Sequence, residues 1–166
     1  MLRQRLEEIT ERNQPEMHGE LIEAARKLTP HSIELLTGQN DSLRYNCVMF
    51  ALGIQEDEDY LLMAEVCPDD VHANTKFIHF LVDSGYLVEC KVPYKGALIA
   101  YSEQGRFRHI GVVAQSGRIR SKWGMGHLYE HLVFEVPYSY GADICYFEPI
   151  DRETVLNAFF EFAKRR

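Results

Sequence analysis

The chain has 166 residues, which allows one domain, or one domain with a small extension. Its composition, 46% hydrophobic and 26% charged, is that of a globular protein and excludes a disordered, collagen-like or coiled-coil chain. The net charge is −7, and basic residues are dispersed apart from the short run 164–166. We therefore expect no nucleic-acid partner.

The N-terminal segment is charged throughout and lacks the apolar stretch of a secretory signal. No apolar run approaches the ~20 residues that a membrane helix needs, so we expect no membrane partner. The default compartment is the cytoplasm, with non-classical export as the alternative. The four cysteines form no C-x-x-C pair, which argues against a zinc knuckle or a redox motif. We expect no cofactor and no metal.

Helical patterns dominate the N-terminal part of the chain. Residues 1–30 predict two helices, because Leu2, Leu6 and Ile9 recur at helical spacing and Pro15 opens a second apolar run. We expect this segment to pack on the core and to take no part in a functional site.

A loop and a short apolar helix follow. Residues 38–42 form a loop by composition, and residues 48–52 predict a helix that begins at or near Cys47. The acidic run 56–59 is expected to be a solvated surface, because like charges repel each other and stay hydrated.

The second half of the chain is rich in β-forming segments. A helix is predicted over residues 74–84, with Gly85 ending it. Short β-rich pieces separated by turn residues follow at 87–92, 96–102, 108–115, 118–123, 133–136 and 144–147. A closing helix begins at Asp151, which is a good N-cap residue.

This order of elements predicts the fold class. Helices come first, then an antiparallel meander, then a closing helix, which indicates an α+β fold rather than alternating α/β. We divide the chain into an N-terminal helical extension, residues 1–38, and a main domain, residues 39–166, which together form one compact unit.

Cys47 is the first candidate for chemistry. A thiol at the N-terminus of a helix feels the positive end of the helix dipole, so we expect a lowered pKa and a reactive thiolate. The alternative is a buried structural cysteine, since free cysteines commonly act as small hydrophobic residues.

His109 is the second candidate. In a strand its side chain shares one face with Gly111 and Val113. We expect open space above His109, because Gly111 provides no side chain, and this suits a general base that reaches a nucleophile on a packed helix. The alternative is an ordinary strand histidine.

A third group is expected on the strand that returns beside His109. Alternation sends Ser121 and Lys122 to opposite faces, so only one of them can face the imidazole. We expect Ser121 there, because it can accept the imidazole N–H, whereas a lysine ammonium only donates. Lys122 then points away or reaches a carboxylate such as Glu130.

Two runs of sequence resemble a known superfamily. Residues 46–53, Asn-Cys-Val-Met-Phe-Ala-Leu-Gly, resemble the cysteine helix of NlpC-like members of the papain-like peptidase superfamily. Residues 109–121 are similar to its histidine strand, glycine turn and return strand. Cys47 and His109 also follow the chain order of papain-like hydrolases.

More closely, the chain resembles a family of small NlpC-like proteins with a shared series of short motifs. In order these are N-C-x-x-x-A-L-G, G-Y, a histidine strand, S-K-x-G, E-H and Y-G. They stand here at 46–53, 85–86, His109, 121–124, 130–131 and 140–141. The resemblance covers about residues 44–150 and leaves the N-terminal helices outside.

The resemblance implies a papain-like core, with an antiparallel sheet packed on the cysteine helix, and a cysteine peptidase or amidase that cleaves a peptide, protein or other acyl substrate. Cys47 would be the nucleophile, His109 the base and Ser121 the third catalytic group. Tyr45 and Asn46 lie just before the nucleophile, where they can line the oxyanion pocket.

Lys122, Glu130 and His131 are expected as supporting residues. At one position the chain departs from the superfamily, because Ser121 stands where peptidoglycan-cutting relatives usually have His, Asn or Gln. That departure favours a second hypothesis, a binding module that kept the papain-like fold and lost its activity.

A zinc hydrolase is the third hypothesis. Residues 127–131 read H-x-x-E-H, and on a helix His127 and His131 would share a face and bind Zn²⁺, with Glu130 as the general base. The segment is short for such a helix, because Gly126 precedes it and the β-rich piece 133–136 follows.

Overall fold

A seven-stranded sheet runs through the part of the chain that the structure describes, residues 1–36 and 44–165 of a computed structural model. Its strand order is β1-β6-β5-β4-β3-β7-β2, and every neighbouring pair is antiparallel. The strands are β1 (Glu34–Leu35), β2 (Glu89–Cys90), β3 (Leu98–Glu103), β4 (Arg106–Val113), β5 (Ile119–Lys122), β6 (Leu128–His131) and β7 (Asp143–Phe147).

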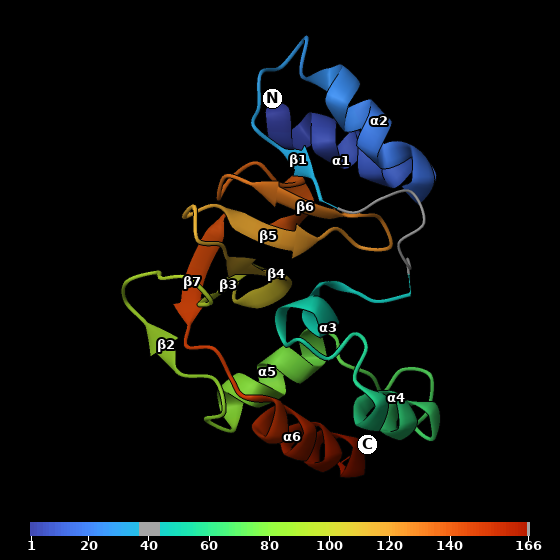
Figure 1. Ribbon diagram of the computed structural model, residues 1–166, viewed down its shortest axis with the longest axis vertical. Helices are drawn as coiled ribbons and strands as arrows, with labels where there is room; N and C mark the ends of the chain where they lie inside the picture. The colour runs from blue at the N-terminus through green and yellow to red at the C-terminus, as the bar shows by residue number, and fades with distance from the viewer. Residues whose placement is uncertain (37–43, 166) are drawn as a thin grey trace.

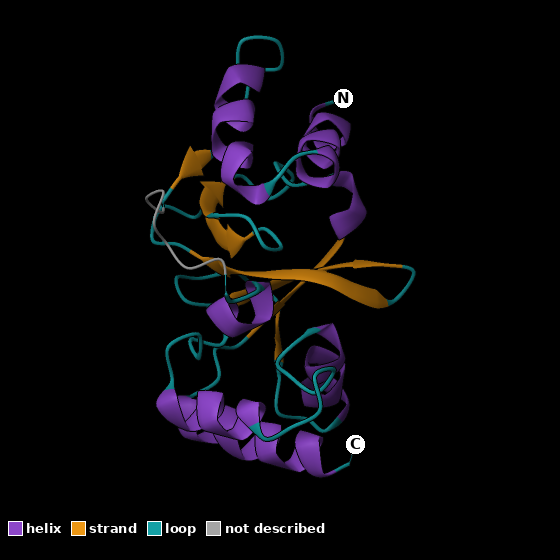
Figure 2. Cartoon of the chain, turned by 90° about the vertical axis from the view of Figure 1, so that its right-hand side faces the viewer, coloured by secondary structure: helices purple, strands orange, loops and turns teal. Residues whose placement is uncertain are grey.

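Helices lie on both sides of this sheet. Helices α1 and α2 form one outer layer, and α3 to α6 lie on the opposite side (Figures 1 and 2). The α-helices are α1 (Leu2–Arg12), α2 (Pro15–Ala25), α3 (Cys47–Ala51), α4 (Glu58–Glu65), α5 (Thr75–Asp83) and α6 (Arg152–Lys164), with a 3-10 turn η1 (Tyr138–Tyr140). The α+β class and the meander β3-β4-β5-β6 are confirmed.

Residues that favour helix ends occur where several of the predicted helices begin or end. Pro15 occupies the first turn of α2, as expected for a residue that lacks an amide donor. The side chains of Asn74 and Asp151 accept backbone amides at the starts of α5 and α6. Gly85 follows α5 with a positive φ of 75°.

The acidic run 56–59 is largely exposed, as predicted, and its Asp57 also caps α4 by accepting the Tyr60 amide. One strand was predicted in the wrong place: residues 133–136 contain a turn and a bend, and the strand lies earlier, at β6. The predicted loop 38–42 lies outside the described residues.

The sheet separates two hydrophobic cores. The first core joins α3, α5 and α6 to one face of the sheet, and Phe77 and Phe159 lie within it, with ring centroids 5.4 Å apart. The second core lies under α1 and α2, where Leu6 and Ile22 pack with Trp123. Both faces of the sheet carry hydrophobic side chains, so each face needs its own layer of helices to cover it.

The N-terminal extension contributes to the sheet as well as to the second core. Strand β1 belongs to the segment assigned to the extension, residues 1–38, and pairs with β6 through Glu34 opposite Glu130. The boundary proposed between residues 38 and 39 lies outside the described residues.

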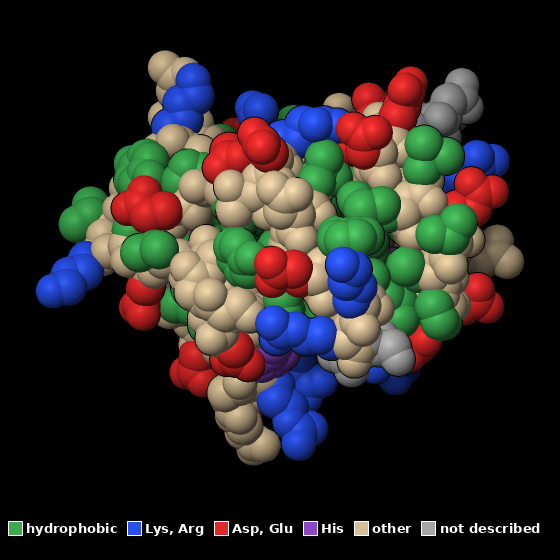
Figure 3. Space-filling model, turned by 90° about the horizontal axis from the view of Figure 1, so that it is seen from below, with side chains coloured by type: hydrophobic (Ala, Val, Ile, Leu, Met, Phe, Trp, Pro, Cys, Tyr) green, Lys and Arg blue, Asp and Glu red, His purple; other side chains and the backbone are tan. Residues whose placement is uncertain are grey.

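The face formed around α4 to α6 mixes charged side chains of both signs with hydrophobic ones (Figure 3). Leu62 and Val66, in and just after α4, and Phe160 in α6 are among the exposed hydrophobic residues. Among the described helices, none is long and apolar enough to cross a membrane.

We predict that Gly141→Ala strongly destabilises the protein. Gly141 has φ +89° and ψ 171°, a region that essentially only glycine adopts, and an added Cβ would lie 2.1 Å from the Ser102 carbonyl oxygen. We expect a loss of about 3 kcal/mol or more in the free energy of unfolding, measured by urea denaturation.

Gly53→Ala is the matched control. Gly53 also has a positive φ, +69°, but an added Cβ meets nothing within 4 Å. It should lose about 1 kcal/mol, the strain of the left-handed backbone alone. Equal losses in the two variants would contradict a steric role for Gly141.

Candidate functional site

The start of α3 is fixed by the side chain of Asn46. Its Oδ1 accepts the amides of Val48 and Met49, at 2.9 Å each, and its Nδ2 donates to the Ala73 carbonyl at 2.8 Å. Asn46 was predicted to line an oxyanion pocket. Its polar atoms are instead used to cap the helix and to tie it to the segment before α5.

Cys47 is the first residue of α3 and lies against strand β4. The backbone amide of Ile110 acts on the Cys47 thiol in the direction that lowers its pKa, and α3 packs against β4. β4 and β5 pair only at Val112 with Arg120 and at Val113 with Ile119. Ile110, the residue after His109, lies beyond the end of this pairing, and the Cys47 sulfur lies beside it.

Burial raises the pKa of the Cys47 thiol, which is the opposite of the direction predicted. Amides of Ile110, Cys47 and Val48 and the charge of Lys122 act in the lowering direction but are outweighed by desolvation. α3 has only five residues, so its dipole is small. The resting group is a neutral thiol.

His109 is buried and neutral. Burial, followed by the charge of His131, holds its pKa well below the ordinary value. Its ring stacks on Tyr140, with centroids 3.9 Å apart and planes at 17°, and lies 5.6 Å from the Tyr101 ring. Its Nε2 atom is buried without a hydrogen-bond partner among the described residues.

The open space expected above Gly111 is not present. A Cβ on Gly111 would lie 2.8 Å from the Arg120 carbonyl oxygen and 3.0 Å from the Ser121 Cβ. Glycine is needed because β5 crosses β4 closely at this point, not because a cleft opens there.

Ser121 contacts a different histidine from the one predicted. Its Oγ lies 2.8 Å from His131 Nε2 and accepts the Trp123 indole N–H at 3.1 Å. His131 Nδ1 donates to the Leu132 carbonyl at 2.8 Å, so Nε2 is the acceptor and the Ser121 hydroxyl is the donor. Burial lowers the pKa of His131 to about 4, so this network is uncharged.

Lys122 points to the other side of β5, as alternation predicted, but it does not reach Glu130. Its ammonium lies 4.6 Å from the centre of the Tyr45 ring and donates to the Gly124 carbonyl at 3.3 Å. The residue is only 1% exposed. Burial lowers its pKa to about 8, and the neighbouring Cys47 acts in the opposite direction.

Glu130 belongs to a surface ion-pair cluster rather than to the candidate site. Its carboxylate lies 2.7 Å from Arg120 Nε and 3.5 Å from Arg118 Nε, and these cations hold the pKa of Glu130 below its usual value. Glu130 and His131 are neighbours on a strand, so their side chains lie on opposite faces.

The H-x-x-E-H motif does not form a metal site in the structure. Most of it lies on strand β6, and its members Glu130 and His131 bind separate partners. Within residues 1–36 and 44–165, no three His, Cys, Asp or Glu side chains are grouped so that they could hold a metal ion.

Tyr140 is a member of the site that was not predicted. It lies at the end of η1, and its ring covers one face of the His109 imidazole. Burial raises its pKa well above the ordinary value, and Cys47 contributes in the same direction. The Tyr140-Gly141 pair was the available signal, since Gly141 lets this turn pass close to β3.

Residues 36–148 match the family described as a domain of unknown function (DUF7689). The match covers more than half of the chain, and the chain therefore belongs to this family. Comparison with curated proteins and with solved structures gave no match.

We predict that Ser121→Ala destabilises the protein. The change leaves two buried groups, Trp123 Nε1 and His131 Nε2, without their partner, which should lower the free energy of unfolding by about 2 kcal/mol or more. Trp123 is the only tryptophan in the sequence, so its fluorescence follows unfolding in urea directly.

The control is Ser116→Ala, which removes an exposed hydroxyl that donates to Glu130. It should change stability by less than about 0.5 kcal/mol. If Ser121→Ala were as stable as this control, the buried network would not be a stabilising element.

We also predict that Lys122 sets the pH dependence of Cys47 alkylation. Removing its positive charge in Lys122→Met raises the thiol pKa further, so the rate of iodoacetamide labelling should shift to higher pH and fall at pH 7 to 8. The measurement is the labelling rate of Cys47 against pH, by peptide mass spectrometry.

Lys95→Met is the control, because it removes a positive charge elsewhere on the protein. The Lys95 ammonium is exposed and donates to the Gln115 side chain. The profile of this variant should match that of the unchanged protein. An identical profile for Lys122→Met would show that the ammonium does not act on the sulfur.

Proposed function

We propose that this member of the family is a cysteine hydrolase with a papain-like, NlpC-like core, which cleaves an amide or related acyl bond of a peptide, protein or other acyl substrate. Two observations support the proposal: the Ile110 amide acts on the Cys47 thiol, and the neighbouring residue, His109, has a buried Nε2 atom without a hydrogen-bond partner among the described residues. A thiol and a neutral imidazole with a free nitrogen are the two reactants that such a mechanism needs.

The proposed reaction starts from a neutral pair. The pKa of Cys47 is raised and that of His109 is lowered, so the thiol keeps its proton until substrate binds. His109 then takes that proton while the sulfur attacks the carbonyl carbon. When the acyl bond breaks, His109 returns the proton to the leaving group, and water then cleaves the thioester.

Lys122 has the role of a local positive charge. It acts on the Cys47 sulfur, and its burial strengthens the interaction with any negative charge that forms there. The oxyanion would be stabilised by this ammonium and by the Cys47 amide at the start of α3. The Val48 amide is already donated to Asn46.

Tyr140 takes the positioning role that was predicted for Ser121. The ring of Tyr140 lies nearly parallel to the imidazole and limits its rotation, whereas the Ser121 hydroxyl donates to His131. The imidazole of His109 is thus positioned by a stacked ring, whereas members of the superfamily usually position it with a hydrogen-bonding side chain.

A binding module without activity is the second candidate. The observation that favours it is the same Nε2 atom of His109, which has no hydrogen-bond partner among the described residues. The two candidates differ in turnover, because a binding module has no reason to form and release an acyl-thiol.

We predict that p-nitrophenyl acetate acetylates Cys47. Mass spectrometry of the intact protein and its peptides should show one acetyl group on Cys47, lost again as water hydrolyses the thioester. His109→Gln should slow acetylation about 100-fold, the usual contribution of a general base. Cys47→Ala should abolish it.

His72→Gln is the control, because His72 is half-buried and its ring Nδ1 bonds the Asp69 carbonyl in its own turn, away from α3 and β4 in the sequence. It should acetylate at the rate of the unchanged protein. Acetylation that spreads over Cys67, Cys90 and Cys145, or that is equal in His109→Gln, would overturn the hydrolase and leave the binding module.

A further inference from the structure

Helix α1 carries two charged side chains that bind the turn η1. Arg3 and Glu7 are four residues apart, so they lie on the same face of the helix. The Glu7 carboxylate accepts the Ser139 amide. The Arg3 guanidinium donates to four backbone carbonyls around the turn, those of Val136 at 3.3 Å, Pro137 at 3.2 Å, Tyr138 at 3.3 Å and Gly141.

The two charges match the two ends of this short turn. Ser139 lies in its first part, where backbone amides lack a partner within the turn and a carboxylate is a suitable acceptor. The carbonyls of Pro137 and Tyr138 each accept one amide inside the turn, and Arg3 supplies a second donor. A 3-10 turn of three residues has little stability of its own, so its conformation depends on such contacts.

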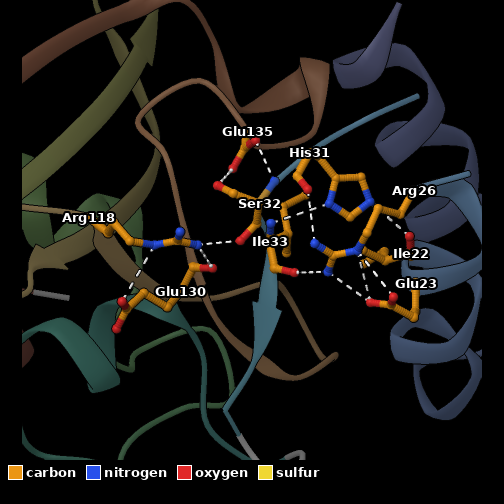
Figure 4. Close-up of polar contacts among 9 residues, drawn as sticks. All are labelled: Ile22, Glu23, Arg26, His31, Ser32, Ile33, Arg118, Glu130 and Glu135. Carbon is orange, nitrogen blue, oxygen red and sulfur yellow. Dashed lines mark hydrogen bonds and ion pairs between the residues drawn. The ribbon is translucent and has the colours of Figure 1, made fainter. Parts of the chain in front are cut away.

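The segment that leads into η1 is held by the same N-terminal extension. Glu135 accepts the amide and the hydroxyl of Ser32, at 2.8 and 2.7 Å (Figure 4). Arg118, just before β5, donates to the Ser32 carbonyl and so ties this contact to the sheet. Residues 135–141 are therefore fixed to the extension at both ends, through Ser32 and through Arg3.

Tyr140 links this segment to His109. The two rings are stacked, with centroids 3.9 Å apart, which is closer than the 5.6 Å between the rings of His109 and Tyr101. The Nε2 atom of His109 has no hydrogen-bond partner among the described residues, so no hydrogen bond of this atom orients the ring. A displacement of η1 would therefore turn or uncover the imidazole.

From these contacts we propose that Arg3 is a positioning residue for His109: its guanidinium fixes η1 and thereby holds the Tyr140 ring against the imidazole. Arg3 acts through Tyr140 and is not itself catalytic. The effect on the reaction rests on the proposed hydrolase function, whereas the effect on the orientation and hydration of the ring does not.

The first test follows the His109 ring by NMR and needs no turnover. Isotope-labelled histidine gives one ring signal per histidine, and the signal that His109→Gln removes belongs to His109. Burial holds the pKa of this ring well below its ordinary value, so its signal should not move between about pH 8 and pH 5.5. In Arg3→Met the loosened turn admits water, so the pKa should rise and the signal should titrate within this range.

The groups that face His109 stay the same in this variant. They are Tyr140 from η1, Tyr101 from β3 and His131 from β6, whose charge also lowers the pKa of His109. A rise in the pKa of His109 in Arg3→Met therefore reports exposure of the ring to water and not the loss of a neighbouring charge. A loss of stability alone would not produce it.

Arg5→Met is the matched control, because Arg5 lies on the same helix and pairs on the surface with Glu8, at 3.3 Å. Its His109 signal should match that of the unchanged protein. Arg3→Lys keeps the charge but not the fork-shaped guanidinium that reaches several carbonyls, so its titration should be intermediate. Glu7→Ala, which removes the acceptor of the Ser139 amide, should shift the signal in the same direction and replaces Arg3→Met if that variant does not fold.

The second test measures acetylation of Cys47 by p-nitrophenyl acetate. Arg3→Met should slow it about 10-fold, less than His109→Gln, because the base is present but held less well. As the pH is lowered, the rate should begin to fall at a higher pH than in the unchanged protein, since a larger fraction of His109 is protonated. Arg5→Met should be acetylated at the unchanged rate.

The two tests fail independently. If the unchanged protein is not acetylated, the hydrolase proposal is overturned, and the ring signals still decide the role of Arg3. A folded Arg3→Met whose His109 signal matches that of the unchanged protein would overturn the positioning role, whatever its acetylation rate. An equal shift in Arg5→Met would overturn it as well.

Discussion

The close crossing of β5 over Gly111 is the constraint on which the candidate site depends. The Arg120 carbonyl oxygen lies 2.8 Å from the position of a Cβ at residue 111, so no other residue fits without moving β5. After two paired positions the strands separate. The Ile110 amide, next to this point, acts on the Cys47 thiol in the direction that lowers its pKa. Gly111 thus allows β5, which carries Ser121 and Lys122, to lie close to β4.

The electrostatics of the site follow from burial more than from the helix dipole. Desolvation raises the pKa of Cys47 and lowers those of His109 and Lys122, so each group is pushed toward its neutral form. A preformed thiolate–imidazolium pair is therefore not the resting state. The face of Tyr45 and the Gly124 carbonyl compensate part of the cost of burying Lys122. The positive charge that acts on the Cys47 sulfur is that of Lys122.

Signals that act over a few residues were sufficient to predict where helices start, but not which residues meet across strands or how deeply a residue is buried. Caps act within three residues, so the helix starts at Asn74 and Asp151 could be predicted. Strand alternation separated Ser121 from Lys122, but it could not say which histidine Ser121 meets, because His131 lies on another strand, two positions beyond the register partner Tyr129. The role of Gly111 was missed for the same reason: the crowding atoms come from β5, and their approach is a property of the folded sheet. The prediction that Cys47 has a lowered pKa failed because local position does not report burial.

The N-terminal helices have more influence on the candidate site than their sequence suggested. Arg3 in α1 donates to the carbonyls of Val136 and Pro137, at 3.3 and 3.2 Å, and to the Gly141 carbonyl, and its guanidinium lies 5.7 Å from the Tyr138 ring. These contacts hold both ends of η1, the turn whose last residue, Tyr140, stacks on His109. No residue of α1 has to touch the imidazole for this to matter, because the ring that limits its rotation is anchored by α1. The extension therefore supports the site, and the orientation of His109 depends on a helix about one hundred residues away in sequence.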